Sequence, residues 1–258
     1  MKIYVCVKHV PDSAATIRIT GPDEIDENIT FLLNPYDENA VEAAVQLKSE
    51  IDDTEIITVS VGKPVAIDTL RSALTMGADR GIHVVTKDRP DSMVTARALK
   101  AAIISDGTPG LILTGKTAID SDGFQTQFRL AALLDMPVAT NVTAIRPQSD
   151  TVTVTCALEA GSEQIVRMSL PSVIGAAKTL NTPRYPTFPD IIKARKKKIM
   201  QVPLADLNIA PSDSRMEIIG LRPAVEKRQP QIIDGPPEKI VSELIRRLDE
   251  EAKIKLVS

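Results

Sequence analysis

The longest polar loop expected after a strand runs from Thr114 to Gly123 and carries glycine near both ends. Glycine lets backbone approach a ligand closely or turn sharply, and Lys116 adds a positive charge. The loop leads into a helix that we expect to begin near Phe124, so the amides of residues 123–126 could hold a phosphate. An adenine nucleotide is therefore a reasonable ligand for this loop.

Spacing alone does not identify this loop as a known phosphate-binding motif. The Gly-Lys-Thr of residues 115–117 resembles the end of a P-loop, but the glycine five positions earlier, Gly110, precedes the strand instead of following it. The acids Asp120 and Asp122 could bind a metal or cap the following helix. We favour capping and expect no metal site.

The remaining candidates for catalysis are few. Cys6 and Cys156 lie in apolar, strand-like runs outside any C-x-x-C pair, and only His9 and His83 supply imidazole. This argues against structural zinc and favours buried, inert thiols, with Cys–His chemistry left open. The sequence suggests no Ser–His–Asp constellation, so we expect no autonomous catalysis from this chain.

A second distinctive stretch covers residues 181–198, where proline falls at every third position from Pro183 to Pro189. Such spacing stiffens an extended loop and lowers the entropy lost on docking. Tyr185 and Phe188 lie in this stretch, so Phe188 is either a protein-docking anchor or a staple for the following helix. The basic run at 195–198 is either a solvated helix face or a contact for acidic surfaces or phosphates.

Strand-like and helix-like segments alternate through the first 140 residues, which predicts an α/β fold with a doubly wound, mainly parallel sheet. The expected strands are Ile3–Val7, Ile56–Val61, Ile82–Val85 and Leu111–Leu113, and the expected helices are 38–50, a segment from Pro64 to Gly77, 92–105 and a segment ending at Leu134.

The rest of the chain has other patterns. We expect a small hairpin excursion between Thr16–Thr20 and Ile29–Leu33, and a second pairing between Thr151–Cys156 and Gln164–Leu170. Val173–Ala177 is expected to return to the main sheet. The chain ends in an amphipathic helix after a long irregular arm, and this helix either packs back on its own domain or embraces a partner chain. The apolar face of that helix comprises Ile240, Val241, Leu244, Ile245 and Leu248.

Composition excludes several classes. The 258 residues carry 31 Lys plus Arg against 34 Asp plus Glu, a formal charge of −3, whereas nucleic-acid binders usually have a basic excess. No apolar run approaches the roughly 20 residues that span a bilayer. The N-terminal residues read neither as a signal peptide nor as an organelle address, so we expect a cytoplasmic protein.

Several motifs in the same order resemble the β subunit of electron-transfer flavoproteins. The resemblance covers nearly the whole chain. It is carried by Val5-Cys-Val-Lys8, Asn34-Pro35 with Ala40-Val41-Glu42, the segment Arg71 to Gly81, Gly115-Lys116 with Ala118-Ile119-Asp120 and Gln125-Thr126, Leu180-Asn181 with Pro183-Arg184-Tyr185 and Pro189, and Lys193 to Ile199.

The resemblance implies an adenine-nucleotide α-hydrolase-like fold and a heterodimer with an α subunit that holds most of a redox FAD. It further implies that residues 1–200 form a nucleotide-binding domain with a structural AMP, and that 201–258 form an arm wrapping the partner. The residues implied to bind the cofactor are Cys6, Asn34, Val61, Gly115, Lys116, Ala118, Asp120, Ser121, Asp122, Gly123, Phe124, Gln125 and Thr126.

By the same resemblance, the loop after Leu180 docks an acyl-CoA-type dehydrogenase, and the membrane is reached only through an acceptor oxidoreductase. The implied docking residues are Tyr185, Phe188, Pro189, Ile191 and Ile192. Glu163 matches a carboxylate that helps to steer the flavin domain. This sequence has Phe188 where leucine is usual, Ser13 where tyrosine is frequent, and Gln127 where glycine commonly follows Gln-Thr.

Three alternatives remain. The flavin-bifurcating branch binds a second FAD in its β subunit, typically with a Gln-Val-Gly-Pro run; residues 125–128 read Gln-Thr-Gln-Phe, which favours AMP. A stand-alone adenine-nucleotide-using enzyme would need a catalytic constellation. A nucleotide-sensing stress protein would fold stably alone, whereas the long arm suggests an obligate partner.

Overall fold

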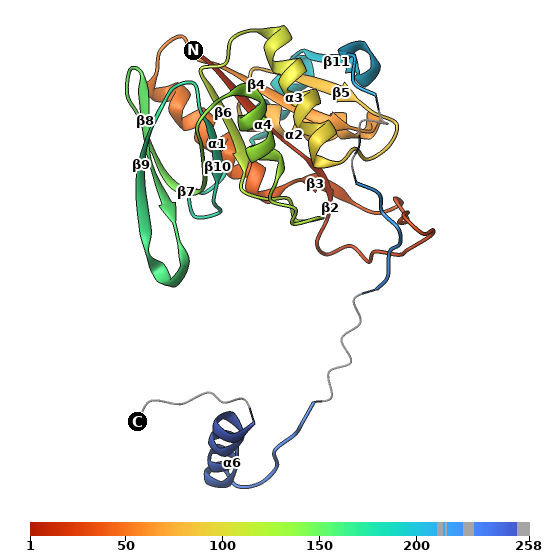
Figure 1. The fold of residues 1–258 in the computed structure, drawn as a ribbon, viewed down its shortest axis with the longest axis vertical. Helices are drawn as coiled ribbons and strands as arrows, with labels where there is room; N and C mark the ends of the chain where they lie inside the picture. Colours follow the sequence, from red (N-terminus) through yellow and green to blue (C-terminus); the bar gives the residue numbers. More distant parts are fainter. Residues whose placement is uncertain (211–213, 215, 224–229, 252–258) are drawn as a thin grey trace. The chain divides into compact units, whose positions relative to one another are not determined.

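The computed structural model describes residues 1–210, 214, 216–223 and 230–251. The chain divides into two compact units, Met1–Gly220 and Leu221–Ser258. The first unit is an α/β domain built on a large, mostly parallel sheet (Figure 1), which confirms the fold class expected from the sequence.

Nine strands form the main sheet in the order β11-β5-β4-β1-β6-β10-β7-β8-β9. The strands from β11 to β7 pair in parallel, and β8 and β9 add an antiparallel extension. The bounds are β1 Lys2–Cys6, β4 Glu55–Gly62, β5 Arg80–Val85, β6 Leu111–Gly115, β7 Val138–Pro147, β8 Thr151–Ala157, β9 Glu163–Ser169, β10 Val173–Ala176 and β11 Ile199–Pro203.

Helices cover both faces of this sheet, as in Figure 1. Ile3 and Val5 of β1 point into a core shared with α1 and α2, whereas Tyr4 points into the core under α3 and α4. This alternation follows from the two-residue period of a strand buried on both faces. The helices are α1 Pro35–Glu50, η1 Pro64–Ala66, α2 Ile67–Met76, α3 Ser92–Asp106, α4 Thr126–Leu134, α5 Phe188–Lys196 and η3 Leu204–Leu207.

The predicted small hairpin is present with its second strand inside Ile29–Leu33, but the first strand does not lie at Thr16–Thr20. Instead, β2 (His9–Pro11) pairs antiparallel with β3 (Phe31–Leu33), and the intervening segment contributes only one isolated bridge, Ile19 to Ile25. Pairing occurs where Val10 and Leu33 can be buried. The isoleucine at position 19 is exposed, so the apolar pattern there predicts a strand that burial does not support.

The later pairings are confirmed: β8 pairs with β9, and β10 inserts between β6 and β7. The strands β7 and β11 were not predicted. β7 has a register shift near Asn141, which adopts a left-handed backbone conformation, and this irregularity interrupts the alternation that would reveal the strand. β11 is a half-exposed edge strand that directly follows the basic run.

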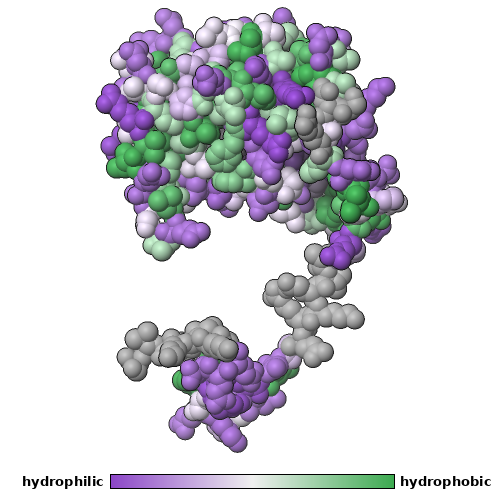
Figure 2. Space-filling model, in the orientation of Figure 1, coloured by the Kyte–Doolittle hydropathy of each residue, from purple (hydrophilic) through white to green (hydrophobic). Residues whose placement is uncertain are grey.

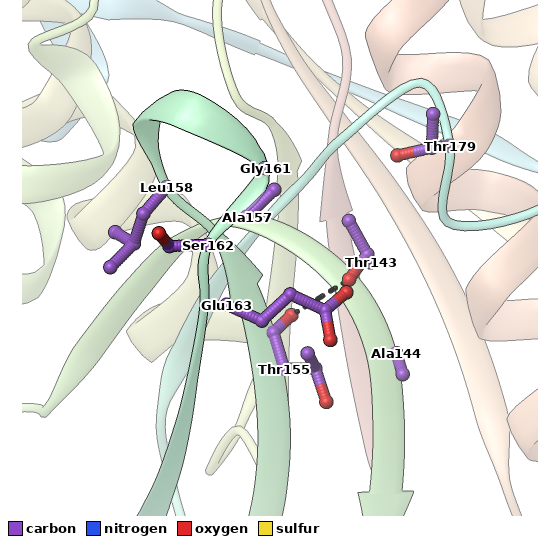
Figure 3. A pocket seen from close by; sticks show the side chains of 9 residues that line it. All are labelled: Thr143, Ala144, Thr155, Ala157, Leu158, Gly161, Ser162, Glu163 and Thr179. Atoms are coloured by element: carbon purple, nitrogen blue, oxygen red, sulfur yellow. Dashed lines mark hydrogen bonds between the residues drawn. The ribbon is translucent and has the colours of Figure 1, made fainter.

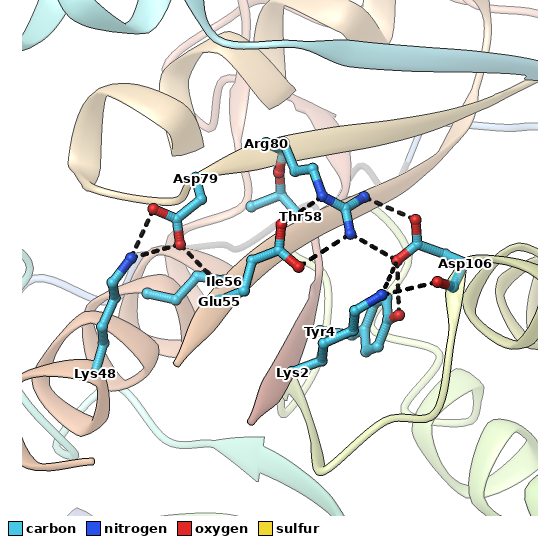
Figure 4. A network of polar contacts seen from close by, with 9 residues as sticks. All are labelled: Lys2, Tyr4, Lys48, Glu55, Ile56, Thr58, Asp79, Arg80 and Asp106. Carbon is cyan, nitrogen blue, oxygen red and sulfur yellow. Dashed lines mark hydrogen bonds and ion pairs between the residues drawn. The ribbon is translucent and has the colours of Figure 1, made fainter. Parts of the chain in front are cut away.

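A network of ion pairs fixes the amino ends of the central strands (Figure 4). Arg80 of β5 forms two hydrogen bonds with Asp106, at the end of α3, and two with Glu55 of β4. The same Asp106 carboxylate accepts from the Tyr4 hydroxyl at 2.8 Å and from Lys2 at 3.3 Å. The network therefore joins β1, β4, β5 and α3 at the sheet edge opposite the expected nucleotide loop.

The second unit contains α6, Pro237–Glu250, which confirms the C-terminal amphipathic helix. The face of α6 visible in Figure 2 is mostly hydrophilic, whereas Val241, Leu244 and Ile245 are exposed apolar residues. Residues 211–213, 215, 224–229 and 252–258 of the expected arm lie outside the described residues, and the wrapping of a partner stays a prediction. None of the helices among the described residues is long and apolar enough to span a membrane.

Candidate functional site

The implied cofactor residues meet at the carboxyl edge of the parallel sheet. Cys6 at the end of β1 is in register with Thr114 of β6 on one side and with Val59 of β4 on the other. The loop that begins at Gly115 and the strand end at Val61 therefore flank the end of β1. This is the edge at which wound α/β sheets bind ligands.

Asn34 ties the start of α1 to the candidate nucleotide loop, residues 115–126. Its buried side-chain amide donates to the Thr117 carbonyl at 2.9 Å, and its side-chain oxygen accepts from the Ile119 amide at 3.2 Å. One side chain thus satisfies both a donor and an acceptor of the loop backbone. Asn34 therefore holds the loop against the domain.

Asp37, which the sequence analysis missed, is the buried acid of this site. Its carboxylate accepts from the Lys8 amide at 2.8 Å and from the Gly115 amide at 2.9 Å, so it joins the first strand, α1 and the loop. Burial raises the pKa of Asp37 to about 7. Gly115 is required because a Cβ there would lie 2.6 Å from the Tyr36 Cβ. From the sequence, an acid in the first turn of a helix indicates only a favourable interaction with the helix dipole. The burial of Asp37 could therefore not be predicted.

The expectation that Asp120 and Asp122 cap the helix is wrong. Asp120 instead accepts from Lys8 Nζ at 2.7 Å, and Asp122 accepts from the Thr117 hydroxyl at 2.8 Å. Helix α4 begins at Thr126 rather than near Phe124, and no side chain caps it. The two acids fold the loop on itself and onto Lys8. Within the described residues, no group of three or more His, Cys, Asp or Glu could hold a metal ion.

The far end of the loop presents backbone amides. Among the described residues, the N–H groups of residues 123–126 donate to no partner, and they lie at the start of α4. Asp122 and Phe124 both have positive φ, at 46° and 51°. This left-handed conformation costs a non-glycine residue roughly 1–3 kcal/mol, and such strain is concentrated at functional sites. The arrangement can receive an anion.

Lys116 and Gln127 tie the loop to the elements around it. Lys116 Nζ lies 3.3 Å from the Asn141 side-chain oxygen and 5.5 Å from the centre of the Tyr36 ring. Gln127 is buried and donates to the Lys116 carbonyl at 3.0 Å and to the Thr140 hydroxyl at 2.9 Å. It thereby links α4, the loop and β7, a contact that its position in the sequence did not suggest.

The docking segment, residues 181–192, exposes its apolar residues. Tyr185 is 94% exposed and Phe188 75% exposed, and Ile191 and Ile192 are also exposed. The interpretation of Phe188 as a staple for α5 is therefore wrong. The helix is started instead by a capping box, in which the Thr187 amide donates to the Asp190 carboxylate at 3.0 Å.

The basic run has two kinds of member. Lys197 donates to the Leu74 carbonyl at 3.0 Å and to the Ala78 carbonyl at 2.6 Å, so it joins the end of α5 to the end of α2. The side chains of Arg195, Lys196 and Lys198 are exposed. The run is therefore partly structural and partly a solvated surface next to the docking segment.

Glu163 starts β9 and is exposed at a shallow pocket of about 510 Å³. In Figure 3 its carboxylate lies near Thr143 and Thr155, side chains of β7 and β8. The pocket belongs to the antiparallel extension, so Glu163 is placed on a different part of the sheet from the nucleotide loop. The exposed carboxylate can form an ion pair with a basic group from outside this chain.

The thiols are buried and free, as expected. Burial raises the pKa of the Cys6 thiol and of the Cys156 thiol, which keeps both in the unreactive, protonated form. Burial lowers the pKa of both His9 and His83. Burial thus favours the neutral form of all four groups.

Residues 25–207 match the family described as Electron transfer flavoprotein domain. A relative from Bradyrhizobium diazoefficiens, named electron transfer flavoprotein subunit beta, is 36% identical over 98% of this chain and 100% of that protein. Relatives with the same name occur in Syntrophomonas wolfei, at 34% identity over 99% of each chain, and in human, at 35% identity over 98% of this chain and 99% of that protein. The resemblance drawn from the motifs is thus confirmed, and the chain belongs to the β-subunit family of electron transfer flavoproteins.

Proposed function

We propose that this chain is one half of a flavin-bearing heterodimer that accepts electrons from an acyl-CoA-type dehydrogenase and passes them to an acceptor. The observation that carries this proposal is the similarity over 98% of the chain to proteins named electron transfer flavoprotein subunit beta. The partner is an α subunit that holds most of the FAD. The predicted compartment is the cytoplasm, with a membrane reached only through an acceptor oxidoreductase.

The nucleotide proposed for this chain is AMP. The residues fit its phosphate, because the amides of residues 123–126 have no partner within the part of the chain that the structure describes, and Lys116 lies in the same loop. The Cys6, Asn34 and Val61 positions would contribute the remaining wall, with the rest of the loop from Gly115 to Thr126 around the ligand. AMP would serve as a structural ligand that orders this edge of the sheet.

This chain would act as a wall and a docking platform, without a catalytic group of its own. FAD bound mainly to the α subunit supplies the redox chemistry. The residues of this chain would exclude water from that flavin and bring the dehydrogenase within electron-transfer distance. Glu163 would attract a basic group of the mobile flavin domain, since its carboxylate is exposed at the mouth of a pocket.

The docking role is proposed for Tyr185, Phe188, Pro189, Ile191 and Ile192. Phe188 is the proposed anchor, because its ring is exposed at the start of a short helix that begins with a capping box and has Pro189 in its first turn. A large, rigid aromatic side chain that is exposed before binding buries the most apolar surface on docking.

Phe188→Ala tests this function. In the heterodimer with the α subunit of the same organism, we expect the apparent KM for that organism's acyl-CoA dehydrogenase, supplied with its acyl-CoA substrate, to rise by about tenfold or more, as at a hot-spot residue. The kcat at saturating dehydrogenase should stay unchanged. Steady-state reduction of the heterodimer, followed by flavin absorbance, measures both values.

Ile104→Ala is the matched control, because Ile104 is an exposed apolar residue of α3, away from the docking segment. It should leave the KM unchanged. An unchanged KM in the Phe188 variant would reject the anchor role, and a wild-type heterodimer that no acyl-CoA dehydrogenase reduces would reject the proposed electron donor.

A further inference from the structure

The docking segment has no secondary structure of its own before α5. Within the described residues, no backbone N–H of residues 182–187 donates to a backbone carbonyl. Pro183 and Pro186 have no N–H to donate, and the Thr187 amide is taken up by the capping box. The conformation that presents Tyr185 must therefore be fixed by contacts with another element.

Helix α1 supplies these contacts through two side chains that are three residues apart and so lie on one face. The first is Asn39, which donates to the Asn181 carbonyl at 2.9 Å and to its side-chain oxygen at 3.0 Å. In return, the Asn181 side-chain amide donates to the Asn39 carbonyl at 3.0 Å. This reciprocal pair fixes the start of the segment.

The second contact is Glu42, whose side chain is only 5% exposed. Its carboxylate accepts from Arg184 Nε at 2.7 Å and from a terminal guanidinium nitrogen at 2.9 Å, in a two-pronged ion pair. It also accepts from the Arg184 backbone amide at 3.3 Å. The carboxylate thus holds both the side chain and the backbone of the residue that precedes Tyr185.

The geometry of this ion pair fixes the orientation of the Arg184 guanidinium. A guanidinium that binds a carboxylate through two parallel hydrogen bonds fixes an orientation, which a single point charge does not. The opposite side of α1 is anchored, because Val41 and Ala44 pack in the core against the sheet. The position of Glu42 is therefore set by the domain core, and Arg184 transmits that position to the segment.

We propose that Glu42 and Arg184 are positioning residues for docking: they hold Tyr185 and Phe188 in the orientation that the dehydrogenase recognises. This inference rests on the proposed docking function. Neither residue needs to touch the dehydrogenase. Losing the pair would release residues 182–186, which carry Tyr185 and lead into α5, into several conformations, and the dehydrogenase would then bind only the fraction that is correctly oriented.

Two variants test the proposal in the heterodimer, with the same acyl-CoA dehydrogenase. Glu42→Gln keeps the shape but removes the charge, and Arg184→Lys keeps the charge but removes the two-pronged geometry. Both should raise the apparent KM by about five- to tenfold and leave kcat unchanged, since fewer molecules are competent to bind but the bound complex is the same. The Arg184 side chain is half-exposed, so Arg184→Lys leaves the core intact. This variant keeps the test valid if Glu42→Gln folds poorly.

Lys48→Met is the matched control, because it removes another ion pair of α1, the one with Asp79, which does not contact the segment. Its KM should equal that of the wild type. Glu42→Gln and Arg184→Lys are each also combined with Phe188→Ala. If the pair acts through the docking anchor, the second change should add little to the first, a departure from additivity that general destabilisation would not produce.

The outcomes separate the two proposals. If Phe188→Ala raises the KM but neither Glu42→Gln nor Arg184→Lys does, the positioning role is overturned and the docking function stands. If the fold-changes in KM from Glu42→Gln or Arg184→Lys multiply fully with that from Phe188→Ala, the ion pair does not act through the anchor, and the inference is also overturned. If Phe188→Ala itself has no effect, the docking function fails, and the positioning role fails with it.

Discussion

At the scale of single residues, Asp37 holds the candidate site together. Its buried carboxylate accepts hydrogen bonds from the backbone amides of Lys8, two residues after β1, and of Gly115. Because burial disfavours the charged carboxylate, its folded-state pKa of about 7 lies well above the unfolded value of 3.8. Between these two values the folded protein binds more protons than the unfolded chain.

We therefore predict that Asp37 makes stability fall as the pH rises from about 4 to about 7. Below that window the carboxyl is protonated in both states, and above it the penalty for burying the charge is complete. Asp37→Asn should remove this slope. It should also destabilise the fold by about 1–3 kcal/mol, because the new amide would face one of the two N–H donors. Chemical denaturation at several pH values measures both effects.

The control is Asp52→Asn, since Asp52 is an exposed acid. It should keep the wild-type slope and stability. An Asp37→Asn protein that loses stability between pH 4 and 7 as steeply as the wild type would show that another group causes the slope.

Residue roles that depend on the neighbours of a side chain were the hardest to predict. The residues carried over by resemblance, such as Asn34 and Gly115, do meet at one edge of the sheet. Asp37, Gln127 and Glu42 were missed because their partners lie far away in the sequence, and polar residues in a helix usually face solvent. The capping role predicted for Asp120 and Asp122 was wrong because their carboxylates accept hydrogen bonds from Lys8 and Thr117 instead of from the helix amides.

At the scale of elements, the Arg80 network holds the amino ends of three strands and one helix together (Figure 4). The hydrogen bonds from Arg80 lower the pKa of Asp106 to about 2, below its unfolded value of 3.8. The stability from this pairing is complete above pH 4 and is lost as the pH falls through about 2.

Arg80→Met should therefore cost about 2–3 kcal/mol at neutral pH, since it removes the guanidinium that pairs with Glu55 and leaves Asp106 with only Lys2 and the Tyr4 hydroxyl as donors. The difference between variant and wild type should shrink as the pH falls from 4 towards 2. Urea unfolding across this range measures it. Lys48→Met, which breaks a more exposed pair, should cost at most about 1 kcal/mol. Equal losses from the two substitutions would contradict a special role for the Arg80 network.

Element prediction succeeded where the apolar pattern agreed with burial. The strands β1, β4, β5 and β6 contain mostly apolar residues that are buried, and each has a neighbouring strand on both sides. The pattern failed for the Thr16–Thr20 segment, whose isoleucines are exposed, and for β7, whose alternation is broken near Asn141. β11 depends on pairing with β5 across a long stretch of chain, which a local pattern does not reveal.

At the scale of the whole molecule, the chain presents surfaces that a partner would cover. The docking segment exposes Tyr185 and Phe188, and α6 exposes Val241, Leu244 and Ile245. The fold class and the family could be predicted from the sequence, because several long motifs occur in one order. The wrapping of a partner could not be derived in the same way, because it depends on a second chain.

The most direct test of the account is a count of bound nucleotides in the purified complex. The chain is coexpressed with the α subunit of the same organism, and the nucleotides released by denaturation are separated and quantified. We predict one FAD and one AMP for each heterodimer. Two FAD for each heterodimer would contradict the AMP assignment, and a colourless chain that captures no α subunit would contradict the proposed function itself.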